Sequence, residues 1–140
     1  HSEDVMWVFS HGGLNAAPIE AALYAKERGL KVVAVTSGDN HRKADAKHSS
    51  GKKLGDVADV MIDNHVPLED SLVWIKGCEL PFSPGSTVAG TAIVSAVVAE
   101  VASCLLARGF KPRTFVSPNV AGVGPDNNQG VFVAYAERLK

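Results

Sequence analysis

The 140-residue sequence has little charge imbalance, two cysteines and no low-complexity tract, and each shortage excludes a class of protein. Lysine and arginine total 14 against 15 aspartate and glutamate residues, so the net charge of −1 gives no electrostatic basis for wrapping nucleic acid or binding an anionic membrane. Cys78 and Cys104 are too few for a disulfide scaffold and are typical of a reducing setting. No basic leader followed by an apolar run opens the sequence. We therefore expect a cytoplasmic protein.

The motifs of several common enzyme classes are also missing. No Gly-x-x-x-x-Gly-Lys-Ser/Thr segment occurs, which excludes a P-loop nucleotide site. No Gly-x-Gly-x-x-Gly pattern follows the first apolar run, so a dinucleotide site is not expected. The five histidines show no zinc-binding spacing with the cysteines, and there is no Gly-x-Ser-x-Gly elbow. The sequence therefore predicts neither a metal nor an organic cofactor.

What is present is enough apolar material for a packed core. Hydrophobic residues make up 46% of the chain and charged residues 21%, which excludes intrinsic disorder. Short β-branched runs alternate with longer helical stretches, a pattern typical of an α/β three-layer α-β-α sandwich around a parallel sheet. Strands are predicted at Val5–Phe9, Lys31–Thr36, Val57–Ile62 and Arg113–Ser117, helices at Ala16–Arg28, Ser86–Arg108 and Gln129–Leu139, and a small hairpin between Ser71 and Phe82.

Two of these segments are unusually apolar. Val5–Phe9 is a continuous apolar run, which predicts a strand buried on both faces. No charge occurs from Leu80 to Ala99, a length that approaches a membrane span, but Glu100 and a composition rich in small residues argue against one. We expect instead a central helix, Thr87–Ala107, packed between the sheet and a neighbour such as the second subunit of a homodimer.

Polar residues gather where ligands bind in open parallel sheets, outside the carboxyl ends of the strands. Directly after the first strand, Ser10 and Asn15 offer a hydroxyl and an amide, while Gly12 and Gly13 allow close approach of backbone N–H groups. The helix that follows adds partial positive charge, which favours phosphate. The alternative is that Ser10 and Asn15 only cap the helix and the glycines only shape a turn.

A second candidate loop opens the long apolar helix. Ser86 and Thr87 follow Pro84-Gly85 and supply two hydroxyls beside free N–H groups. The alternative is that the two hydroxyls merely cap the helix. The fold can aim this loop and the Ser10 loop at one point, so we predict a shared anion site.

A third segment, Asn40–Lys53, is polar and basic. An anionic ligand under a basic flap is one interpretation, and His48 could then move a proton beside a sugar. A solvated loop is the alternative. The segment's cationic residues are Arg42, Lys43, Lys47, Lys52 and Lys53.

Taken in order, these segments resemble the SIS (sugar isomerase) domain family. Asp4–Asn15 is similar to the family's strand followed by Ser-x-Ser-Gly-x-Thr/Asn, and Ala25–Ser37 to its helix and Lys-Val-Ile-Ala-Ile-Thr strand. Ala58–Asp63 resembles the family's Ala-Asp-hydrophobic strand, and Ser86-Thr87 resembles the Ser-Thr opening of its long helix. The segment His48–Lys52 resembles an uncharacterised SIS-domain group labelled as phosphosugar isomerases.

The resemblance implies a sugar phosphate as ligand, with Ser10, Asn15, Ser86 and Thr87 at the phosphate. An aldose–ketose isomerase would also need a proton-transferring acid and base, for which His48 is the first candidate. Glu100 is a weaker candidate, since in mid-helix it can instead pair at a subunit contact. The alternatives are a non-catalytic sugar-phosphate sensor and an oligomerisation module built on the apolar helix.

Two departures from the family pattern matter. Gly12 replaces the second serine of Ser-x-Ser-Gly, which removes one hydroxyl donor. The family's opening βα portion is absent, so in a flavodoxin-like strand order the strand Val5–Phe9 would lack a neighbour and leave an unpaired edge. We therefore expect residues 1–140 to form a single SIS-type domain that is the C-terminal part of a longer chain.

Overall fold

The computed structural model describes residues 1–124 and 126–139. They fall into two compact units, which are described separately. The first unit is His1–Ala96, and the second begins at Val97, within the long helix α4 (Ser86–Ala107).

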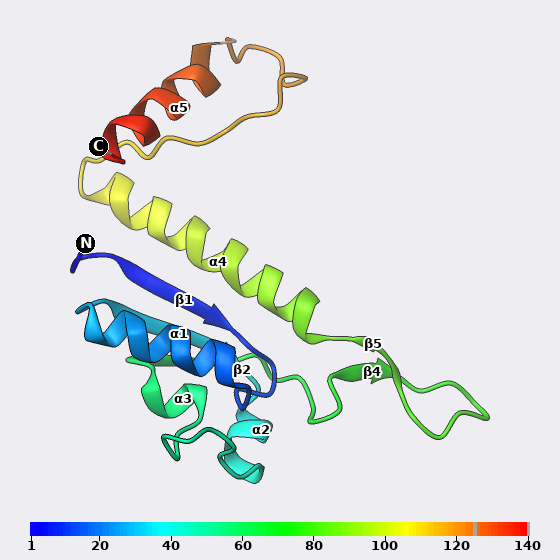
Figure 1. Ribbon diagram of the computed structural model, residues 1–140. Coiled ribbons are helices and arrows are strands. Elements are labelled where there is room, and N and C mark those ends of the chain that lie inside the picture. Colours follow the sequence, from blue (N-terminus) through cyan, green and yellow to red (C-terminus); the bar gives the residue numbers. More distant parts are fainter. Residues whose placement is uncertain (125, 140) are drawn as a thin grey trace. The chain divides into compact units, whose positions relative to one another are not determined.

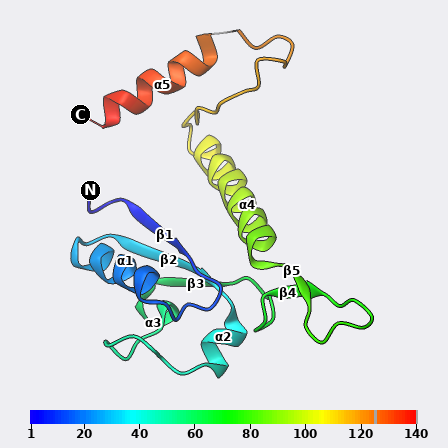
Figure 2. The ribbon, with the colours of Figure 1, turned by 45° about the vertical axis from the view of Figure 1, so that its right-hand side comes forward.

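A three-stranded parallel sheet forms the centre of the first unit (Figures 1 and 2). Its strands are β1 (Val5–Phe9), β2 (Lys31–Thr36) and β3 (Val60–Asp63), in the order β1-β2-β3. The register aligns Phe9 with Val35, so the carboxyl ends of β1 and β2 meet at one edge of the sheet. The parallel sheet with its flanking helices confirms the predicted α/β class.

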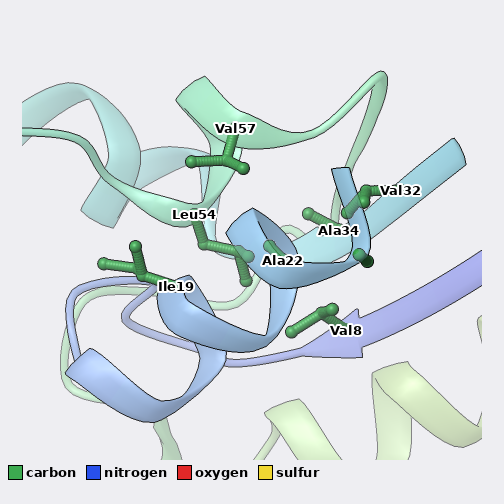
Figure 3. Close-up of a cluster of buried hydrophobic side chains, with 8 residues drawn as sticks. Val8, Ile19, Ala22, Val32, Ala34, Leu54 and Val57 are labelled. Carbon is green, nitrogen blue, oxygen red and sulfur yellow. The ribbon is translucent and has the colours of Figure 1, made fainter. Parts of the chain in front are cut away.

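One face of the sheet is covered by α1 (Ala16–Glu27) and the short helix α3 (Leu54–Val57). Ile19 and Leu54 are fully buried between these helices and the sheet, so apolar burial holds this layer in place. The buried side chains of this core, shown in Figure 3, are Val8, Ile19, Ala22, Ala25, Val32, Ala34, Leu54 and Val57.

The third strand begins later than the sequence predicts. Val57 ends α3 instead of opening β3, because the backbone N–H of Lys53 donates to the Asp56 carboxylate at 2.7 Å and closes a helical turn there. Another short helix, α2 (Gly38–Lys43), opens the polar stretch after β2, where the sequence analysis predicts no helix, and the Ser37 hydroxyl caps it.

The prediction that β1 is buried on both faces is wrong. Val8 points into the core, whereas Val5 and Phe9 are 50% and 46% exposed. The aromatic rings of Trp7 and Phe9 stack at a centroid distance of 6.0 Å on the face away from Val8. β1 also forms an edge of the sheet, with β2 as its one paired strand in the described chain, as the unpaired-edge prediction requires.

The predicted hairpin is present as β4 (Ser71–Val73) and β5 (Phe82–Pro84), which pair antiparallel. The helix α4 starts directly after it. Gly90 is the buried residue of α4 within the described chain. The packing of this helix against a second subunit stays a prediction. By length and composition alone, α4 is also a helix that could span a membrane, with 6% of its most apolar window buried.

The second unit contains the end of α4 and the helix α5 (Asp126–Arg138). The predicted strand Arg113–Ser117 is wrong, since this segment pairs with no described strand. The side-chain amide of Asn128 makes the hydrogen bonds that a neighbouring strand would make. It accepts from Val116 N–H at 3.0 Å and donates to Val116 C=O at 2.9 Å. The backbone N–H and C=O of Val116 are thereby satisfied without a sheet.

Candidate functional site

A cavity of about 490 Å³ lies in the first unit, between the carboxyl end of β1 and the start of α4. Its position matches the place where parallel sheets bind ligands. The residues around it carry hydroxyls, an amide, an imidazole and apolar groups: Phe9, Ser10, His11, Val35, Asn64, Ser86, Thr87, Gly90, Thr91, Val94 and Ser95. Ser10, Ser86 and Thr87 therefore line one cavity, although they come from loops far apart in sequence.

Ser10 is held by the backbone around it. Its N–H donates to Val35 C=O at 3.1 Å, which continues the β1–β2 pairing by one residue. Its hydroxyl oxygen accepts from Gly13 N–H at 3.3 Å. The hydroxyl proton of Ser10 has no acceptor among the described residues, so it remains able to donate to a ligand.

The other loop residues predicted to bind phosphate do not line this cavity. Gly13 has φ +61°, and a Cβ on it would lie 2.8 Å from Thr36 Oγ1, so this glycine serves a tight turn. Gly12 has open space beside it, and Asn15 caps α1 by its backbone position without a side-chain hydrogen bond. The phosphate role of these three residues stays a prediction.

The start of α4 is occupied by a carboxylate that the sequence analysis missed. Asp70 accepts from Ser86 N–H through Oδ1 and from the Ser86 hydroxyl through Oδ2, both at 2.8 Å. Asp70 itself has φ +62°, outside the range most residues adopt. Capping aspartates normally directly precede their helix, so one lying before the β4–β5 hairpin gives no local sequence signal.

His11 also lines the cavity and was not among the predicted site residues. Its Nε2 lies 3.2 Å from Asn40 Nδ2 and 3.4 Å from Leu68 C=O. Its Nδ1 is buried without a hydrogen-bond partner, 3.8 Å from Asp70 Oδ1. The ring is thus held by protein groups on the Nε2 side and faces a carboxylate on the other.

Three further polar residues that line the cavity were missed, namely Asn64, Thr91 and Ser95. Asn64 follows β3 directly, and its side-chain Oδ1 accepts from Val66 N–H at 3.0 Å, which fixes the amide at the cavity. The rule that placed Ser10 at the end of β1 would have found Asn64 as well. Thr91 lies one turn into α4 and donates its hydroxyl proton to Thr87 C=O at 2.9 Å.

His48 is not among the residues that line the cavity. Its side chain is 6% exposed, with Nε2 2.8 Å from Glu20 Oε1 and Nδ1 2.8 Å from Ser50 Oγ. Glu100, the second catalytic candidate, lies on the part of α4 in the second unit, where Cys104 Sγ is 3.8 Å from its carboxylate. The catalytic roles of His48 and Glu100 stay predictions.

The basic segment Asn40–Lys53 is partly neutralised by Asp39, the acid that directly precedes it. Lys43 and Arg42 donate to Asp39 at 3.0 and 2.6 Å. The hydrogen bond from Lys43, followed by the one from Arg42, holds the pKa of Asp39 below its usual value. Two cations of the segment Asn40–Lys53 are therefore already paired with a neighbouring carboxylate.

Comparison with known proteins bears on the family. Residues 1–37 match the model of the SIS domain. This match confirms the resemblance to the SIS family. The matched SIS segment contains β1, the Ser10 loop, α1 and β2, which are the elements that build one side of the cavity.

The curated relatives are UPF0309 proteins. One from Thermoanaerobacter pseudethanolicus is 41% identical over 140 residues, which cover 99% of this chain and 56% of the relative. One from Caldanaerobacter subterraneus is 41% identical, covering 95% and 54%, and one from Streptomyces avermitilis is 37% identical, covering 99% and 55%. The chain therefore spans about half the length of the curated relatives it matches.

Proposed function

We propose that the first unit binds a sugar phosphate in the cavity between Ser10 and Ser86. The observation that carries this proposal is that both hydroxyl-bearing loops line the same cavity. Its volume of about 490 Å³ lies within the range of small-molecule sites. The SIS-domain match of residues 1–37 supports a phosphorylated carbohydrate as the ligand class.

The lining groups suit such a ligand. Ser10 can donate its hydroxyl proton to a phosphate oxygen, and the Asn64 amide offers further polar contact. Phe9, Val35 and Val94 supply apolar surface against which the carbon face of a sugar can pack. Polar groups on one side and apolar groups on the other fit an amphipathic carbohydrate ester.

Binding without turnover is the version we favour, in a sensor or regulatory role. The imidazole at the cavity, His11, has Nε2 beside Asn40 and Leu68 and Nδ1 turned toward Asp70. A group that moves protons on a ligand must reach it within hydrogen-bond distance. Within the described chain, the isomerase alternative therefore needs His11 to turn toward the ligand or His48 to approach the cavity. A turnover assay separates the two versions.

Isothermal titration calorimetry with hexose, heptose and amino-sugar phosphates tests the proposal. We expect binding that depends on the phosphate, and a loss of about tenfold in affinity for Ser10→Ala, because a hydrogen bond to a charged group is removed. Ser49→Ala, an exposed serine in the basic segment, is the matched control and should bind as the wild type does. Absence of phosphate-dependent binding, or equal affinity of Ser10→Ala, contradicts the proposal.

A further inference from the structure

Two of the hydroxyls at the α4 side of the cavity, those of Ser86 and Thr91, donate their protons to protein groups. A serine or threonine hydroxyl has one proton and two lone pairs. The Ser86 proton goes to Asp70 Oδ2 at 2.8 Å, and the Thr91 proton goes to Thr87 C=O at 2.9 Å. Towards the cavity, both oxygens can therefore only accept a hydrogen bond.

The negative charge of Asp70 beside Ser86 also disfavours an anion at the α4 end of the cavity. Both carboxylate oxygens of Asp70 are engaged by Ser86, through its N–H and its hydroxyl. Within ion-pair distance of Asp70 in the described chain lies one group, the His11 imidazole, whose Nδ1 is 3.8 Å from Asp70 Oδ1. A phosphate dianion carries only acceptor oxygens, so it would meet acceptors and a like charge beside Ser86.

The Ser10 end has the opposite polarity. The Ser10 oxygen accepts from Gly13 N–H, and its proton remains without an acceptor in the described chain. Ser10 thus has a proton to donate to a ligand, whereas the Ser86 and Thr91 oxygens on α4 can only accept one.

We propose that Asp70 is a positioning residue that fixes Ser86 as a hydrogen-bond acceptor, so that the α4 end of the cavity takes a hydroxyl or ammonium group of the ligand. The phosphate then lies at the Ser10 end. This inference rests on the proposed function and refines it: the ligand is a phosphate monoester with hydrogen-bond donors at the far end of its carbon chain. It also moves Ser86 from the phosphate to the sugar.

The test compares two phosphate monoesters by calorimetry on the 140-residue chain. Glucosamine 6-phosphate carries hydroxyls and an ammonium, and methyl phosphate carries neither. We expect the wild type to prefer glucosamine 6-phosphate by about tenfold or more, the size of a hydrogen bond to a charge-assisted acceptor. Asp70→Asn should reduce this preference to about threefold or less, because the new amide can donate to Ser86 and release its proton toward the cavity.

Two other variants guard the interpretation. Glu69→Gln removes the adjacent, exposed negative charge and should keep the wild-type preference. Ser86→Ala deletes the acceptor while leaving Asp70, and should reduce the preference as Asp70→Asn does. If Asp70→Asn loses the helical circular dichroism signal because the cap of α4 is weakened, Ser86→Ala decides.

The outcomes separate the two proposals. If neither monoester binds the wild type, the proposed function fails and this inference fails with it. If both bind but the preference is absent, or survives in Asp70→Asn and Ser86→Ala, only this inference is overturned. A gain of tenfold or more in methyl phosphate affinity in Asp70→Asn, with the preference kept, also overturns it, since Asp70 would then occupy the phosphate's own place.

Discussion

The Glu20 carboxylate lies 2.8 Å from Nε2 of His48, and this contact ties the segment after α2 to helix α1. On its other side, the imidazole lies 2.8 Å from the Ser50 hydroxyl. A histidine predicted as a proton shuttle over a ligand is thus a tether between a loop and a helix in this structure.

We expect His48→Ala to loosen the loop at residues 44–53 without emptying the cavity. Loss of both contacts should raise amide hydrogen exchange in that loop, while affinity for hexose phosphates changes by about twofold or less, since His48 is not a lining residue. Lys47→Ala, an exposed change in the same loop, is the control. A loss of binding of tenfold or more, or loss of a measurable isomerase turnover, would restore His48 to the site.

The two adjacent glycines after β1 should respond differently to alanine. At Gly13 the new Cβ meets Thr36 Oγ1 at 2.8 Å, and φ is +61°, so Gly13→Ala should destabilise the fold by about 1–3 kcal/mol. At Gly12 nothing lies within 4 Å of the built Cβ, so Gly12→Ala should be close to neutral. Urea unfolding of both variants checks this, and equal midpoints would contradict the assigned turn.

A longer side chain at Gly90 should fill the cavity. A Cβ there lies 3.6 Å from Phe9 Cδ1, an ordinary contact, so Gly90→Ala should fold well and gain about 0.5–1 kcal/mol of helix stability. Gly90→Leu extends beyond that Cβ and should weaken sugar-phosphate binding by about tenfold or more. Calorimetry and thermal melts of both variants measure this. Undiminished binding by a folded Gly90→Leu would place the ligand elsewhere.

Asp59 should make stability depend on acid pH. It accepts from Lys26 Nζ at 2.7 Å, from Val32 N–H at 2.8 Å and from Lys31 Nζ at 3.2 Å. The hydrogen bond from Lys26, followed by the one from Val32 N–H, holds the pKa of Asp59 well below its usual 3.8. Because the folded pKa is depressed, its contribution to stability is present above 3.8 and is lost as the pH falls toward the folded value.

The corresponding variant is Asp59→Asn. Its urea midpoint should be lower than that of the wild type near pH 7, and it should lose less further stability between about pH 4 and pH 2. Asp45→Asn, at an exposed position in the basic segment, should keep the wild-type acid profile. Parallel acid profiles for Asp59→Asn and the wild type would show that the contacts of Asp59 contribute nothing.

Local patterns were sufficient to predict much of the fold. An apolar run predicts β2, and a helical pattern that ends before Gly29 predicts α1. The hairpin predicted between Ser71 and Phe82 is found close to those limits. The place of Ser10 follows from the carboxyl-end rule for parallel sheets, which needs only the strand assignment. Its meeting with Ser86 does not, because Ser86 follows β5 of the separate antiparallel hairpin.

What the sequence could not predict depends on partners distant in the chain. The cap of α4 comes from Asp70 across a hairpin, and the neighbour of Val116 is the side chain of Asn128. The exposure of a side chain also depends on residues distant in the sequence. The apolar run of β1 predicts burial on both faces, but Val5 and Phe9 lie on a face of the sheet that the described chain leaves partly uncovered. Hydrophobic periodicity indicates which side chains can be buried, and the packing of the whole chain decides which of them are buried.

The bare edge of β1 has a practical consequence. In the part of the chain that the structure describes, no strand pairs with this edge, so its amides and carbonyls, beside half-exposed Val5 and Phe9, can pair with an extended segment as a fourth strand. When the added strand comes from a second copy of the chain, the association is bimolecular, so it increases with protein concentration. Affinities and melting temperatures of this chain are therefore comparable only between samples of equal protein concentration. Dilution should reduce aggregation through this edge.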